Sequence, residues 1–162
     1  MHTTNHSDLF KIIQSYKNGV KDNIDNFNIT NFNISEIKFE YSGLRNSIFE
    51  NCIFENCIFE TVYLDNSVFK NCIFKNCSFE FIDFGLSKTI FENTIFYKTK
   101  FIKTDSDSSF IDTSFILCNF LYFDITSNIL NKCKIIESNI KGLIHSPNAF
   151  EENNNIILSD LK

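Results

Sequence analysis

Six cysteines are the residues in this sequence best suited to chemistry, because a thiolate is both a nucleophile and a metal ligand. Each stands two residues before a large apolar residue, where other segments carry Ser, Thr or Val. No Cys-x-x-Cys pair occurs, and the three histidines, His2, His6 and His145, lie far from the cysteines in the sequence. We therefore expect inert, inward-facing thiols and no bound metal or cofactor, with a redox or metal-binding role as the alternative. The cysteines are Cys52, Cys57, Cys72, Cys77, Cys118 and Cys133.

Catalytic motifs are also missing from the sequence. It contains no P-loop, no G-x-G-x-x-G, no H-E-x-x-H and no G-x-S-x-G. His145 has no nucleophile beside it, so we interpret it as a surface or capping residue. With the thiols assigned to the interior, the usual bases and nucleophiles are lacking. We predict that this protein is not an enzyme.

The cysteines belong to a pattern in which every fifth residue, from Ile24 to Ile140, is large and apolar. The pattern has 23 units, and 14 of the 20 phenylalanines occupy its central position. It slips twice, which we interpret as insertions of two residues (Ser87–Lys88) and of four residues (Thr104–Asp107). A period of five fits neither a helix nor a flat strand, so the chain must turn a corner in each unit.

A longer period of twenty residues is visible in the same region. Asn46–Glu60 reads NSIFENCIFENCIFE, and Asn66–Glu80 reads NSVFKNCIFKNCSFE. Four units therefore form one turn of a solenoid, and residues twenty apart should stack between neighbouring turns. We expect about six turns, an interior of small and large apolar residues, and ladders of stacked asparagines on the outside.

The unit of a small residue, any residue, Phe or Leu, and two polar residues resembles the pentapeptide-repeat family. Ser47–Asn51 and Cys52–Asn56 are representative, and the resemblance covers about residues 22–142. It implies an all-β solenoid, a right-handed four-sided parallel β-helix. Some members of the family bind DNA gyrase as mimics of the double helix, confer quinolone resistance and dimerise end to end through their C-terminal turns.

The two ends require cover, because a stacked core leaves apolar surface open. We expect residues 1–21 to supply a capping helix, Asp8–Asn18, over residues 22–142. Ser146-Pro147 indicates a second short helical cap in residues 143–162. This segment either caps the solenoid or dimerises, and the resemblance favours a two-fold homodimer. Its contact residues would be Leu143, Phe150, Ile156, Ile157 and Leu158.

Two outward surfaces are candidate partner sites. On one side of the solenoid Glu40, Glu60 and Glu80 should stack, with Tyr41 and Phe81 beside them, as an acidic strip for a basic partner. The alternative is three hydrated carboxylates whose repulsion is screened by salt. On two other sides apolar columns should form, which mark either an interface or only a preference for strand conformation. These columns contain Ile48, Val68 and Ile90, and Ile53, Ile73 and Ile95.

Composition limits the choice of partner. The 162 residues carry a net charge of −5, which is typical of neither nucleic-acid binders nor proteins that bind anionic membranes. No apolar run is long enough to span a membrane, and the polar start Met1–His6 does not resemble a secretory signal, so we expect a cytoplasmic protein. We predict a protein-interaction scaffold with an unidentified protein partner. The alternative is a DNA mimic that binds gyrase or topoisomerase.

Overall fold

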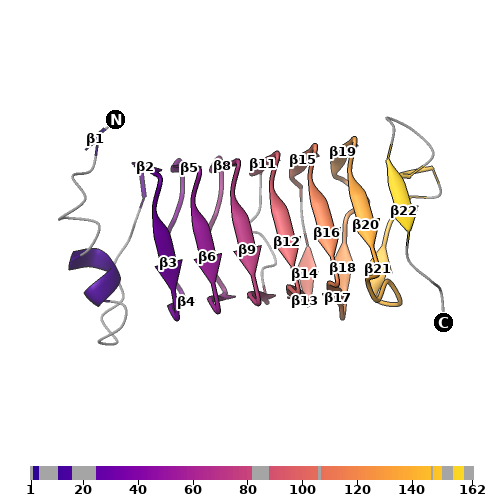
Figure 1. Cartoon of the computed structure of the whole chain (residues 1–162), viewed down its shortest axis with the longest axis horizontal. Helices are drawn as coiled ribbons and strands as arrows, with labels where there is room; N and C mark the ends of the chain where they lie inside the picture. The colour runs from indigo at the N-terminus through magenta and orange to yellow at the C-terminus, as the bar shows by residue number, and fades with distance from the viewer. Residues whose placement is uncertain are drawn as a thin grey trace.

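The computed structural model describes residues 2–3, 11–15, 25–81, 88–105, 107–146, 148–150 and 155–158. These residues form a parallel β-solenoid of about six turns, with successive turns side by side along the long axis (Figure 1). The predicted all-β solenoid fold is therefore confirmed. We number the turns one to six from residues 26, 46, 66, 88, 107 and 127, and the four sides in the order in which the chain visits them.

Each side is built from short parallel strands, most of them three residues long. Side one contains β1 (His2–Thr3), β2 (Phe27–Thr30), β5 (Ile48–Glu50), β8 (Val68–Lys70), β11 (Ile90–Glu92), β15 (Ser109–Ile111) and β19 (Ile129–Asn131). Side two contains β3 (Asn33–Ser35), β6 (Ile53–Glu55), β9 (Ile73–Lys75), β12 (Ile95–Tyr97), β16 (Ser114–Ile116), β20 (Lys134–Ile136) and β22 (Ile156–Leu158).

Side three contains β4 (Lys38–Glu40), β7 (Ile58–Glu60), β10 (Ser78–Glu80), β13 (Lys100–Ile102) and β17 (Asn119–Phe120). Side four is less regular, with β14 (Thr104–Asp105), β18 (Phe123–Asp124), β21 (Leu143–Ile144) and a bridge between Gly43 and Tyr63.

The corners between sides explain why asparagine is so frequent. Among the described residues, twenty-one other than glycine have a positive φ, and nearly all of them stand two residues after a central core residue. Asparagine adopts this left-handed conformation more readily than other side chains. Stacked corner amides also bond between turns, as in Asn51 to Asn31 (3.1 Å) and Asn93 to Asn71 (2.8 Å). The predicted asparagine ladders therefore lie at corner positions where the backbone has a positive φ.

The core consists of phenylalanine columns that run along the solenoid. On side two Phe54, Phe74 and Phe96 stack with ring centroids 4.7 and 5.0 Å apart and nearly parallel planes. Neighbouring columns meet edge to face, as in Phe54 and Phe59 at 5.7 Å and 64°. Both arrangements are favourable for aromatic rings. In these columns the phenylalanine rings occupy the central position of each repeat unit, which the sequence predicts to point inward.

The two irregularities in the repeat lie on side four. Phe69 pairs with Phe91, 22 residues away, which agrees with a two-residue insertion, although residues 82–87 lie outside the described chain. The interpretation of the second slip as a four-residue insertion was wrong. Phe91 pairs with Phe110, only 19 residues away, so the fourth turn lacks one residue and has no four-residue insertion at Thr104–Asp107.

Thr104 occupies an ordinary small inward position, and its hydroxyl donates to the Phe79 carbonyl at 3.2 Å. In the next turn Phe123 pairs with Thr104 and stacks on Phe101 at 4.6 Å. Its ring lies in the core beside the shortened side.

The ends differ from each other. Residues 11–15 are helical, and Ile13 is buried within the core cluster, whereas the rest of the predicted helix Asp8–Asn18 lies outside the described residues. At the other end the expected helix start at Ser146 was wrong for the residues described, because 148–150 form a turn. The chain then adds β22 to the open edge of β20, where Ile156 N–H donates to the Cys133 carbonyl at 2.8 Å. An unpaired strand edge favours this outcome over a helix.

Candidate interaction surfaces

The cysteines lie in the small inward positions and are all buried free thiols. Each donates to a carbonyl of the preceding turn, as Cys72 Sγ does to the Phe49 oxygen at 3.3 Å. Serine and threonine make the same bond elsewhere, for example Thr94 to the Phe69 oxygen at 3.1 Å. The shared bond explains why Ser, Thr and Cys alternate at this position.

Two pairs of stacked thiols share hydrogen bonds that lower the pKa of Cys52 and of Cys57, whereas burial makes Cys118 and Cys133 poor nucleophiles. Burial raises the pKa of Cys118 to about 12 and also raises the pKa of Cys133. A hydrogen bond with Cys52, followed by burial, raises the pKa of Cys72 far above that of a free thiol. Among the described residues, no group of three or more His, Cys, Asp or Glu side chains is placed to hold a metal ion.

The acidic strip is present in the predicted register. Glu60 pairs with Glu40 on one side and with Glu80 on the other, and all three point outward from side three. The influence of Lys38 on this strip was not predicted from the sequence. Its ammonium lies 2.6 Å from the Glu60 carboxylate and 3.3 Å from that of Glu40, and these hydrogen bonds raise the pKa of Lys38. One lysine therefore compensates two of the three carboxylates.

Two aromatic rings border the strip, as predicted. Tyr41 and Phe81 are exposed at the corner that follows it, with Thr61 between them. Lys103 of the fourth turn lies over the Phe81 ring at 5.4 Å. Past Glu80 the column continues with Ile102. The acidic strip therefore ends at the fourth turn, in the middle of the molecule, where Ile102 and Lys103 follow Glu80 and Phe81.

The isoleucine columns are also in register. Val68 pairs with Ile48 and Ile90 on side one, and Ile73 pairs with Ile53 and Ile95 on side two. These side chains are half-buried, and Ile95 is exposed. The charged column Glu50, Lys70, Glu92 and the asparagine ladder lie between them. The apolar surface is thus two parallel stripes on adjacent sides with a polar corner between them.

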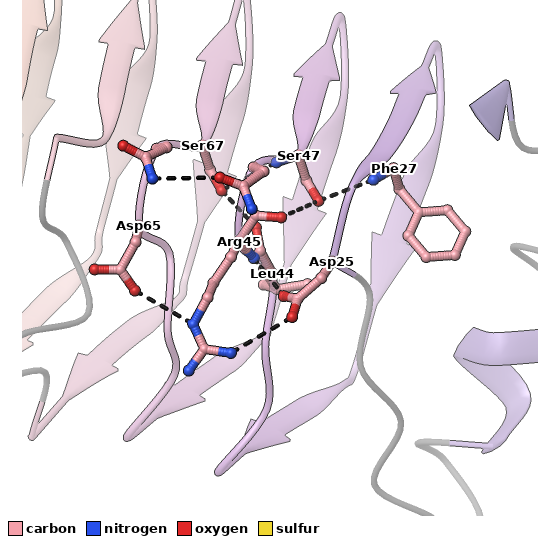
Figure 2. Close-up of polar contacts among 9 residues, drawn as sticks. Asp25, Phe27, Leu44, Arg45, Ser47, Asp65 and Ser67 are labelled. Carbon is pink, nitrogen blue, oxygen red and sulfur yellow. Dashed lines mark hydrogen bonds and ion pairs between the residues drawn. The ribbon is translucent and has the colours of Figure 1, made fainter. Parts of the chain in front are cut away.

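Charged columns elsewhere alternate in sign. Arg45 lies between Asp25 and Asp65 (Figure 2), and its guanidinium nitrogens are 3.4 and 3.5 Å from the two carboxylates. The same guanidinium lies over the Tyr63 ring at 4.2 Å. Lys75 contacts Glu55 at 2.6 Å, and Lys70 contacts Glu92 at 3.4 Å. These surface pairs add little stability individually, but they keep like charges from stacking directly in these columns.

The C-terminal residues predicted to dimerise divide into two groups. Leu143, Phe150 and Ile157 are partly buried against the chain's own core. Ile156 and Leu158 are exposed on the outside of β22. The described part of the segment thus packs on the last turn, and of the five predicted residues Ile156 and Leu158 are the ones exposed to a partner.

No family model matches the sequence, and no curated protein matches it either. Structural comparison finds proteins of similar fold, among them three pentapeptide-repeat proteins that are each 13% identical to this chain. Full-length QnrB1, a plasmid-mediated fluoroquinolone resistance protein, has a TM-score of 0.32 and matches 78% of this chain and 90% of its own. HetL, involved in heterocyst differentiation regulation in the cyanobacterium Nostoc sp. strain PCC 7120, has a TM-score of 0.32 with coverages of 86% and 70%.

Rfr23 from the cyanobacterium Cyanothece 51142 has a TM-score of 0.29 and covers 94% of this chain and 99% of its own. The resemblance is one of fold. The fold is established by the parallel strand register and the five-residue repeat of this chain. The low identities and TM-scores give no information about its function. In the part of the chain that the structure describes, no helix is long and apolar enough to cross a membrane.

Proposed function

We propose that this repeat protein is a non-enzymatic scaffold that binds a protein partner through its isoleucine columns. The observation that carries the proposal is the pairing of Ile48, Val68 and Ile90, and of Ile53, Ile73 and Ile95, as continuous outward stripes. Stripes of this kind on a rigid rod are typical of protein interfaces.

The strand conformation alone does not require these isoleucines. In the same two columns the fifth turn carries Ser109 and Ser114, and both keep the parallel register with Ile90 and Ile95. Serine is thus compatible with the backbone at these positions. The isoleucines add outward apolar surface beyond what the fold needs, which supports a role in binding.

The test is capture of a partner from host extract by the purified protein and by a triple variant, Ile53→Ser, Ile73→Ser and Ile95→Ser. The matched control is Ile129→Ser, an exposed residue in the side-one column beyond the triplet. We expect the wild type and the control to retain the same partner and the triple variant to lose it while its thermal melt stays cooperative. Retention of the partner by the triple variant would overturn the proposal.

The second candidate is a DNA mimic that binds gyrase through the acidic strip. The register of Glu40, Glu60 and Glu80 favours it, and the contacts of Lys38 weigh against it. If the strip binds gyrase, Glu60→Lys with Glu80→Lys should abolish any inhibition of supercoiling by the purified protein. A wild-type protein that has no effect on supercoiling would remove this candidate.

Two further expectations belong to the proposal. Exposed Ile156 and Leu158 are the residues through which a C-terminal dimer would form. A cytoplasmic location agrees with a core that keeps its described cysteines as free thiols.

A further inference from the structure

Four of the six cysteines stack thiol on thiol between turns two and three. Cys52 and Cys72 occupy the same small inward position before side two, and Cys57 and Cys77 the equivalent position before side three. The residue after each cysteine pairs in register with the residue after its partner. Within each pair a hydrogen bond joins the two thiols. The core of these two turns therefore contains two dithiol pairs.

The other two cysteines have no thiol in the same position of a neighbouring turn. All six thiols are buried to the same degree, with exposed fractions of 2% or less. Pairing, rather than burial, therefore divides the cysteines into two classes. The neighbours in the adjacent turns are Thr99 and Ser138 for Cys118, and Thr113 and Asn155 for Cys133.

The spacing of a stacked pair suits a disulfide. Neighbouring parallel strands lie about 4.8 Å apart, which is within the Cα separation of about 4.4–6.8 Å that a disulfide spans. The Cβ atoms of stacked residues are separated by a similar distance, slightly more than the preferred range of about 3.5–4.5 Å. Bond formation must therefore draw the two turns slightly together. A disulfide strained in this way is readily reduced again.

We propose that the pairs Cys52–Cys72 and Cys57–Cys77 are two redox modification sites, which a hydroperoxide converts reversibly into disulfides between turns two and three. The first bond ties β6 to β9, and the second ties β7 to β10. Neither site involves a bound partner or the outward isoleucines, so this inference is independent of the proposed function.

The reaction has two steps, which are the same in both pairs. In the first, the Cys52 sulfur attacks one oxygen of hydrogen peroxide, the O–O bond breaks, and the thiol proton leaves with the other oxygen as water. In the second, the Cys72 sulfur attacks the resulting sulfenic acid, the S–O bond breaks, and the Cys72 proton leaves with the hydroxyl group as water. Two thiols are oxidised to one disulfide, and one peroxide is reduced to two waters.

The hydrogen bonds within the pairs favour this order of attack. The bond with Cys72 lowers the pKa of Cys52, and the bond with Cys77 lowers the pKa of Cys57. Because the thiolate is the reactive form, Cys52 and Cys57 are the first sulfurs to be oxidised. Their partners then supply the second sulfur of each disulfide.

Peroxide reaches these buried thiols when neighbouring turns separate locally. Cys118 and Cys133 are equally buried, so they serve as internal controls for access. When the turns close again, a sulfenic acid on Cys52 meets the thiol of Cys72, whereas one on Cys118 meets the hydroxyl group of Ser138. Only the stacked cysteines can therefore end as a disulfide.

Two double variants of identical composition test the pairing. The matched variant, Cys57→Ser with Cys77→Ser, keeps the stacked pair Cys52 and Cys72. The mismatched variant, Cys52→Ser with Cys77→Ser, keeps Cys57 and Cys72, which lie before different sides of the solenoid. Serine fills the equivalent position before side one, so both variants should fold, and circular dichroism melts check this.

Each full-length protein is treated with hydrogen peroxide, and its free thiols are then counted after denaturation and its intact mass is measured. We expect the wild type to lose four thiols and about 4 Da, and the matched variant to lose two thiols and about 2 Da. The mismatched variant should form no disulfide and should gain about 16 Da for each thiol that is oxidised. Dithiothreitol should restore the lost thiols of the first two proteins.

Disulfide formation to the same extent in both double variants would overturn the proposal. So would a disulfide that contains Cys118 or Cys133, or a bond between two protein molecules. A wild type that keeps all its thiols in peroxide that fully oxidises free cysteine would overturn it too, as would a wild type that gains oxygen without losing hydrogen.

Discussion

At the residue scale, the small inward position decides what the cysteines can do. Cys118 is buried, its thiol donates to the Phe96 carbonyl at 3.3 Å, and its backbone N–H is bonded to the Ser138 hydroxyl at 2.9 Å. The same position accepts Ser47, Ser67 and Thr94 elsewhere. A thiol held in this way contributes packing and one weak hydrogen bond, and its proton is hard to remove.

The raised pKa of Cys118 predicts a loss of stability at alkaline pH. Below about pH 9 the thiol is protonated in both states, whereas between about pH 9 and 12 only the unfolded chain releases the proton. Unfolding therefore becomes easier as pH rises, by about 1.4 kcal/mol for each pH unit within this window.

Urea unfolding of the wild type and of Cys118→Ser at pH 7.5 and pH 10.5 measures this contribution. Serine is the matched replacement because Ser138 makes the same bonds in the next turn. We expect the advantage of cysteine over serine to shrink at the higher pH. An unchanged difference between the two proteins would show that the thiol is not protected by burial.

At the element scale, each turn is stabilised by its neighbours through rings in the core. Phe74 is fully buried, stacks on Phe54 and Phe96, and meets Phe69 and Phe79 edge to face. A short strand of three residues has little stability of its own. Burial of the rings against neighbouring turns, together with the backbone hydrogen bonds between turns, therefore holds each turn in place.

Replacing Phe74 by alanine should lower the free energy of unfolding by about 3–5 kcal/mol, because it leaves a cavity within three adjacent turns. Phe74→Leu should cost clearly less, since Leu44 and Leu64 fill the same inward position on side four. Urea denaturation of both variants gives the comparison. Equal losses for leucine and alanine would show that ring stacking, rather than filled volume, dominates.

Much of this architecture could be predicted from the sequence, because the repeat indicates which residues point inward and which residues of neighbouring turns pair. The period of twenty gave the pairings of Phe49 with Phe69 and of Glu60 with Glu80 directly. The second slip could not be resolved in the same way. Phe110 stands nine positions after Phe101, and two units that lack one residue or one unit with a four-residue insertion produce the same spacing.

Other features depend on side-chain reach or on aperiodic chain, where the repeat gives no information. Lys38 stands two residues before Glu40, and only the structure shows that its ammonium also reaches Glu60 in the next turn. The tail after Gly142 carries no five-residue period, so its pairing as β22 was not predictable.

At the scale of the whole molecule, the solenoid is a rod whose sides differ in chemistry. Sides one and two carry apolar stripes beside charge columns that alternate in sign. Side three carries the acidic strip in its first three turns. A partner that binds sides one and two is therefore held by apolar contact, and a partner of side three by charge.

The salt dependence of partner capture tests the proposed scaffold function most directly. Host extract is passed over the immobilised protein at about 0.05 M and at about 1 M salt, which changes the Debye length from more than 10 Å to about 3 Å. Binding through the isoleucine columns predicts that the same partner is retained to nearly the same extent at both ionic strengths. Loss of that partner at high salt would contradict the account and point to the acidic strip.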